Sequence, residues 1–229
     1  MELYLAPLPA STGKALILFP DVWGWNSGRI RAIADALAGE GYIVAVPKIL
    51  TPSLDGGTDG DALPPKGSFS MDWIKNFPWE VQKPKVDAVL SFVRAKGGAK
   101  IGVVGICYGA HPACWVSSEN EDVVCGVTLH PSVQLEQFAF GGDCAKLLES
   151  VKCPFLFMPA GNDLPMWAEE GPFGQALKAS AKGASCVFKP YPDMAHGFFN
   201  RGDVSDENIK RDVGLAVADA KAFFASHMG

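Results

Sequence analysis

The sequence contains no apolar run of about 18 residues, which is the length that a membrane-spanning helix needs. Positive charge is also scarce, because 20 lysines and arginines stand against 25 aspartates and glutamates, for a formal net charge of −5. Binding to nucleic acid requires clustered positive charge, so we expect no nucleic-acid partner and no membrane. The acidic first residues run into Pro7 and Pro9, unlike a signal peptide. These features predict a soluble, cytoplasmic protein.

Metal-ligand and disulfide patterns are missing as well. The six cysteines include no Cys-x-x-Cys pair, and the four histidines form no closely spaced run of ligands. Cys125 and Cys186 lie in apolar stretches, where a reduced thiol packs as a small hydrophobic group. A chain of 229 residues can build a core without a disulfide framework. We therefore expect no metal, no cofactor, and five cysteines that only pack.

The order of apolar segments predicts one α/β domain over residues 1–229. Strands are expected at 15–19, 42–46, 101–104, 123–129, 155–158 and 186–188, and helices at 27–39, 71–95, 109–118, 143–150, 165–182 and 206–226. The strands are apolar throughout, as in strands that are covered on both faces. This predicts a mostly parallel central sheet with helices on both of its faces.

The stretch from Pro47 to Ser70 has no regular pattern and contains three further prolines and several glycines. A loop of this length is typical of a lid, a binding loop or a simple connection. It follows an expected strand, and ligands of α/β sheets bind beyond the carboxyl ends of strands. A lid and a solvent-exposed connection both stay open.

One cysteine differs from the other five. Gly105-Ile106-Cys107-Tyr108-Gly109 stands directly between an expected strand and an expected helix. So sharp a turn tolerates only very small neighbours and holds its central side chain exposed, as in a nucleophile elbow. The following helix N-terminus favours a thiolate. A buried cysteine in a tight turn is the alternative.

A cysteine nucleophile needs a base, and four histidines are available. His196 lies between the last expected strand and the last expected helix, at the same sheet edge as the elbow. His130 also follows an expected strand, and we interpret it as structural or supporting. His111 is expected to cap or pack on the helix after the elbow, and His227 to lie in a frayed tail. We therefore select His196.

The third member of a triad orients the imidazole and stabilises its charged form. Asp163 follows the strand expected at 155–158, which gives the chain order Cys107, Asp163, His196 found in α/β-hydrolases. Asp193, three residues before His196, is the alternative, and we interpret it as a turn residue.

Two backbone groups are candidates for an oxyanion hole. One is the N–H of Tyr108, the residue after the nucleophile, and the other is the N–H of Val22, in the loop after an early strand. Asp21 would then lie near the thiol, where its carboxylate could accept the proton or hold it in a resting hydrogen bond. An ordinary loop aspartate is the alternative reading of Asp21.

Together these segments resemble the dienelactone hydrolases, or carboxymethylenebutenolidases, of the α/β-hydrolase superfamily. The resemblance covers nearly the whole chain and rests on Asp21-Val22-Trp23-Gly24-Trp25-Asn26, Gly105-Ile106-Cys107-Tyr108-Gly109, Gly161-Asn162-Asp163 and His196-Gly197-Phe198 with Arg201. The Asp-x-x-Gly-Trp form is closer to eukaryotic-type members than to bacterial enzymes, which carry glutamate at the position of Asp21. The resemblance implies an α/β-hydrolase fold without a large cap domain.

The resemblance also implies a reaction, the hydrolysis of a small ester or a strained lactone through a thioester on Cys107. Arg201 would pair with a substrate carboxylate, and Trp23 would contribute to the substrate site. The sequence departs from the family pattern at Lys48, where aspartate is common. It also has no arginine over 65–80, where bacterial members carry a second one.

Two other functions stay open on the residues alone. One is a non-catalytic small-ligand-binding member of the fold, although a binder has no need of a complete Cys-Asp-His set. The other is a thiol redox sensor that uses Cys107, although Cys114, two helical turns away, is no obvious resolving partner. For the oligomeric state, a monomer and a dimer are equally open.

Overall fold

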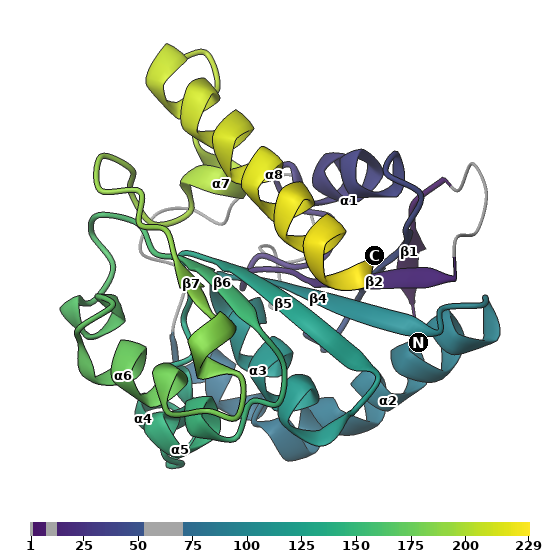
Figure 1. Cartoon of the computed structure of the whole chain (residues 1–229), viewed down its shortest axis with the longest axis horizontal. Coiled ribbons are helices and arrows are strands. Elements are labelled where there is room, and N and C mark those ends of the chain that lie inside the picture. The colour runs from purple at the N-terminus through teal and green to yellow at the C-terminus, as the bar shows by residue number, and fades with distance from the viewer. Residues whose placement is uncertain (1, 8–12, 53–70) are drawn as a thin grey trace.

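The computed structural model describes residues 2–7, 13–52 and 71–229, and its strands form one seven-stranded sheet (Figure 1). In chain order the strands are β1 (Leu3–Leu5), β2 (Lys14–Phe19), β3 (Ile43–Pro47), β4 (Lys100–Ile106), β5 (Val123–Leu129), β6 (Phe155–Met158) and β7 (Val187–Phe188). Across the sheet they run β1-β3-β2-β4-β5-β6-β7, and every neighbouring pair is parallel except β1 with β3. The expected mostly parallel sheet is confirmed.

Helices cover both faces of this sheet, as expected. The helices α1 (Ile30–Ala38) and α8 (Glu207–Met228) lie on one face, and α2 (Trp79–Ala95), α3 (Ala110–Glu119), α5 (Cys144–Glu149) and α6 (Pro172–Lys178) lie on the other (Figure 1). In β2, Ile17 and Phe19 pack with α2 and α3, whereas Leu16 and Leu18 pack with α1 and α8. Successive side chains of a strand point to opposite faces, so a strand between two cores must be apolar throughout. The described residues include no inserted cap domain.

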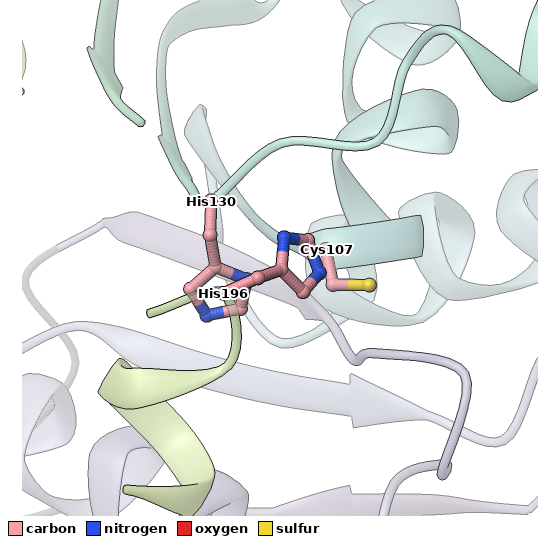
Figure 2. Close-up of side chains that lie close together, drawn as sticks. All are labelled: Cys107, His130 and His196. Carbon is pink, nitrogen blue, oxygen red and sulfur yellow. The ribbon is translucent and has the colours of Figure 1, made fainter. Parts of the chain in front are cut away.

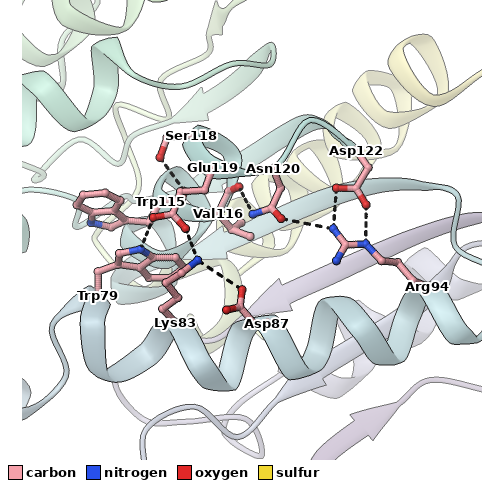
Figure 3. Close-up of polar contacts among 10 residues, drawn as sticks. All are labelled: Trp79, Lys83, Asp87, Arg94, Trp115, Val116, Ser118, Glu119, Asn120 and Asp122. Atoms are coloured by element: carbon pink, nitrogen blue, oxygen red, sulfur yellow. Dashed lines mark hydrogen bonds and ion pairs between the residues drawn. The ribbon is translucent and has the colours of Figure 1, made fainter.

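Contacts between α2 and α3 hold the helix that follows the elbow (Figure 3). The indole of Trp79 stacks on that of Trp115 with ring centroids 5.8 Å apart, and its Nε1–H donates to Glu119 Oε1 over 2.9 Å. Lys83 forms an ion pair with the same glutamate. The far end of α2 is tied to the start of β5, because Arg94 donates from two nitrogens to Asp122. These contacts fix α3 against its neighbour.

Several expected elements differ from the structure. The expected 71–95 helix is a 3₁₀ helix, η1 (Met71–Asn76), followed by α2, because Pro78 keeps the preceding residue out of helical geometry. The expected 165–182 helix is likewise split into η3 (Pro165–Trp167) and α6, since Pro172 begins a new helix. The sequence pattern also missed β1, whose three residues are too few to show a period.

The C-terminal end of the chain is helical, unlike the expectation from the sequence. The prediction of a frayed tail around His227 is wrong, because α8 continues to Met228 and His227 Nδ1 lies 2.9 Å from Phe223 O. Most of the expected lid, residues 53–70, lies outside the described part of the chain. The remaining short elements are η2 (Cys107–Gly109), α4 (Leu135–Phe138), η4 (Gly183–Ser185) and α7 (Phe198–Arg201). Among the described helices, none combines the length and apolar character needed to span a bilayer.

Candidate active site

Cys107 occupies a sharp turn at the carboxyl end of β4. Its φ angle is 54°, in the left-handed region that residues other than glycine rarely adopt. The two flanking glycines have a steric reason: a Cβ on Gly109 would lie 2.1 Å from Phe19 O, and one on Gly105 would lie 2.5 Å from the Cα of Ala110. Only residues without a side chain fit there, so the chain turns from strand to helix within a few residues. The turn leaves the Cys107 side chain half-buried, between the two hydrophobic cores.

The loop after β6 and the loop before α7 bring Asp163 to His196. The Nδ1–H of His196 donates to Asp163 Oδ1 over 2.6 Å, and the other carboxylate oxygen accepts from Ala160 N over 2.8 Å. Asn162 Oδ1 accepts from His196 N over 2.6 Å and joins the two loops. Asp163 therefore fixes the ring of His196, whereas Asp193 lies exposed on the preceding turn.

The electrostatics of this pair favour a charged imidazole. Burial favours the neutral form of His196, but the hydrogen bonds and negative charges of Asp163 and Cys107 outweigh it and raise the pKa of His196 to about 10. An imidazolium is therefore the main form at neutral pH. A cation beside a cysteine is the surrounding in which a thiolate forms.

Asp21 is buried beside this group, in the loop after β2. Its Oδ1 accepts from Trp23 N over 3.0 Å, and its Oδ2 accepts from Asn200 Nδ2 over 2.6 Å. Burial raises the pKa of Asp21 to about 6, although Asn200, Arg201, the Trp23 N–H and His196 all act in the opposite direction. The carboxyl group is therefore poised between its two protonation states near neutral pH.

A cavity of about 690 Å³ joins these groups. Its lining includes Asp21, Trp23, Cys107, His196 and Arg201, all of which were expected from the sequence. The guanidinium of Arg201 lies 5.6 Å from the centre of the Trp23 ring, and its Nη1–H donates to Ser27 Oγ. The first turn of α8 forms another part of the wall, which includes Arg211. A thiol, an imidazole and a guanidinium therefore line one cavity.

The two expected oxyanion residues lie on neighbouring strands. Val22 follows β2 and Tyr108 follows β4, and these two strands pair side by side in the sheet. The Tyr108 side chain is fully buried, with its hydroxyl donating to Phe77 O over 3.1 Å. The Tyr108 side chain therefore belongs to the core and is not part of the cavity lining.

Two further residues lie beside the thiol and the base: Ser132, which the sequence analysis did not consider, and His130, which was interpreted as structural or supporting. Ser132 Oγ lies 3.6 Å from Cys107 Sγ, and Ser132 N donates to Cys107 O over 3.0 Å. The ring of His130 is fully buried with its centroid 4.7 Å from that of His196 (Figure 2). Both follow β5, the neighbour of β4 in the sheet. That position after a strand was the only signal for them in the sequence.

His111 has a place in the core, away from the thiol. Its Nε2 lies 2.6 Å from Glu136 Oε2, and the same oxygen accepts from Trp115 Nε1–H over 3.0 Å. Burial lowers the pKa of His111, against the opposing effect of Glu136. This contact links α3 to α4 and thereby supports the segment that carries Ser132.

Comparison of the sequence with known proteins identifies a family and several related chains. A family profile described as the dienelactone hydrolase family matches residues 1–228. A carboxymethylenebutenolidase homolog from Rattus norvegicus is 28% identical over 205 residues, covering 88% of this chain and 77% of its own. The hydrolase tropI of Talaromyces stipitatus is 27% identical over 242 residues, covering 100% and 87%.

A solved structure matches at the level of the fold. A Klebsiella pneumoniae protein assigned to the dienelactone hydrolases superposes with a TM-score of 0.68 at 16% identity. The superposition covers 95% of this chain and 98% of that one. At this identity the likeness concerns the α/β-hydrolase fold alone.

Proposed function

The chain belongs to the dienelactone hydrolase family and is a hydrolase of carboxylic esters or lactones, and we propose that it acts through a thioester on Cys107. The observation that carries the proposal is the connected group of Cys107, His196 and Asp163 at one edge of the sheet. In this proposal Cys107 is the nucleophile, His196 the base and acid, and Asp163 the group that orients the imidazole.

The first half of the reaction forms the thioester. The Cys107 thiolate attacks the carbonyl carbon, and the backbone N–H groups of Tyr108 and Val22 stabilise the oxyanion. Collapse of the tetrahedral intermediate breaks the carbon–oxygen bond of the ester or lactone. The His196 imidazolium gives its proton to the leaving oxygen, and an enol leaves most readily because the negative charge that develops on its oxygen before protonation is delocalised.

The second half of the reaction releases the acid. His196, now neutral, removes a proton from water, and the resulting hydroxide attacks the thioester carbonyl. Cys107 leaves as a thiolate and the imidazolium is regenerated, so both protons and charges return to their starting state. The raised pKa of His196 supports the resting ion pair that begins this cycle.

The cavity supports a small, negatively charged substrate. Arg201 is half-buried in the wall, where a planar guanidinium can receive a carboxylate in two hydrogen bonds. Trp23 lies under that guanidinium and adds an apolar surface. We therefore propose a small ester or lactone that carries a carboxylate, of which dienelactone is the test case. A reducing compartment such as the cytoplasm suits a mechanism that needs a free thiol.

The test is hydrolysis of cis- and trans-dienelactone and of p-nitrophenyl acetate by the wild type and by Cys107→Ala. Cys186→Ala is the matched control, because Cys186 is the other half-buried free cysteine. We expect dienelactone turnover that is lost in Cys107→Ala and kept in Cys186→Ala, with an acyl adduct on Cys107 by mass spectrometry. Full activity in Cys107→Ala refutes the mechanism. Saturable binding without turnover supports the ligand-binding alternative, and peroxide reactivity without turnover supports the redox sensor.

A further inference from the structure

His130 is a fully buried group in the wall of the cavity. Among the described residues its polar neighbour is the Asn200 side chain, which neither ring nitrogen meets in a hydrogen bond of normal geometry. Buried polar atoms are nearly always paired, because an unpaired one destabilises the folded state. The backbone of His130 is also in the left-handed region, at a φ of 37°. A buried imidazole that is poorly satisfied by its protein neighbour, on a left-handed backbone at a cavity wall, can still bind a ligand.

Two further donor atoms lie beside this ring. The Sγ of Cys107 and one ring nitrogen each of His130 and His196 all lie within 4.8 Å of one another. The three side chains come from the end of β4, the end of β5 and the loop before α7 (Figure 2). Tetrahedral zinc with one sulfur and two nitrogen ligands holds its donor atoms roughly 3.3–3.6 Å apart. Small rotations of these side chains therefore suffice to close the site.

From this cluster we propose that a zinc-class divalent ion binds across Cys107, His130 and His196 and reversibly inhibits the enzyme. Thiolate and imidazole are the ligands that zinc prefers. Asp163 already holds Nδ1 of His196, which leaves Nε2 for the metal and completes the carboxylate–histidine–metal arrangement of many zinc sites. The Asp21 carboxyl group lines the same cavity. The fourth coordination position faces the cavity, where water can fill it.

Binding needs no oxidant and transfers no electrons. Metal bonds form to Cys107 Sγ and to the two imidazole nitrogens, and the proton shared by Cys107 and His196 leaves to solvent. The ion then occupies both the nucleophile and the base. Inhibition therefore rests on the proposed function, whereas binding requires only the three side chains.

The first measurement is binding to the full chain without substrate, with Co²⁺ as a spectroscopic probe and Zn²⁺ as its competitor. We expect one Co²⁺ per chain with a thiolate-to-metal charge-transfer band that Zn²⁺ abolishes. Saturating Zn²⁺ should also slow alkylation of Cys107 by iodoacetamide, and a chelator should restore it. The proposed metal site is refuted if the wild type shows no such band, or if Zn²⁺ does not slow the alkylation of Cys107.

The second measurement tests His130 itself. His130→Asn suits a left-handed backbone, because asparagine tolerates that region, and it removes the imidazole. We expect the Zn²⁺ inhibition constant for ester hydrolysis to rise at least about tenfold in this variant. His227→Asn, on the last turn of α8, is the matched control and should leave the constant unchanged. An unchanged constant in His130→Asn, or activation of the wild type by Zn²⁺, overturns the proposal.

The two proposals fail in different ways. Hydrolysis that depends on Cys107 without a cobalt band refutes the metal site and leaves the proposed function standing. A Cys107-dependent cobalt band in a protein without Cys107-dependent hydrolysis supports the metal site and refutes the proposed mechanism.

Discussion

Replacing Asp21 by asparagine should change how the stability of the protein depends on pH. The carboxyl group is 2% exposed, and its pKa rises from 3.8 to about 6 because burial disfavours the charged form. The folded state therefore holds this proton more tightly than the unfolded chain does. The resulting stabilisation is complete below about pH 4 and is lost as the pH rises through 6.

The magnitude follows from the size of the pKa shift. A rise of about two pKa units at about 1.4 kcal/mol each corresponds to about 3 kcal/mol of unfolding free energy. Asparagine does not titrate, so the free energy of unfolding of Asp21→Asn contains no such contribution that is lost as the pH rises. The free energy of unfolding of the variant minus that of the wild type should therefore increase by about 2.4 kcal/mol between pH 4 and pH 7, because the unfolded Asp21 is already partly ionised at pH 4. Altered hydrogen bonds to Asn200 and Trp23 add only an offset that is independent of pH.

Urea denaturation across this pH range measures the difference directly. Because both proteins share all other titrating groups, their contributions cancel. Asp87→Asn is the control, since its carboxylate is exposed on α2 and stays in water when the protein folds. A difference that stays flat or falls with pH for Asp21→Asn would show that Asn200, Trp23 and Arg201 stabilise the carboxylate more than burial disfavours it.

Three further predictions concern the elbow and its neighbours. Gly109→Ala should lower the free energy of unfolding by about 1–3 kcal/mol and reduce activity, because its Cβ would meet the Phe19 carbonyl. The control Gly214→Ala, on the open surface of α8, should instead raise the free energy of unfolding by about 0.5–1 kcal/mol. Equal effects of the two substitutions in denaturation curves would contradict the steric argument. Ser132→Ala should lower kcat/KM about fivefold, the equivalent of about 1 kcal/mol for one hydrogen bond to the thiol, and an unchanged value would remove Ser132 from the site. The pKa of His196, followed by NMR of its ring protons, should fall in Cys107→Ala because a negative neighbour is lost, and an unchanged pKa would refute the ion pair. Hydrolysis by the wild type should decline above about pH 10, as the His196 imidazolium loses its proton.

The sequence alone was sufficient to predict the parallel part of the sheet and the candidate triad. Parallel strands buried on both faces are apolar throughout, so β2 to β6 stand out as continuous runs. The glycines around Cys107 mark the elbow because only hydrogen fits beside the Phe19 carbonyl and Ala110. The carboxyl ends of parallel strands share one edge, so the loops that carry Asp163 and His196 were expected to meet there.

Tertiary structure alone decided which further side chains surround the thiol and how burial shifts the pKa of the buried Asp21. Ser132, His130 and Asn200 reach the site because β5 lies beside β4 and α7 contacts the loop after β2, and no local pattern encodes those distances. The raised pKa of Asp21 depends on burial by residues from distant segments, which charge and spacing in the sequence do not report. A sequence specifies the periodicity and turn chemistry of its own segments. The distances and desolvation that set reactivity arise only when separate segments pack together.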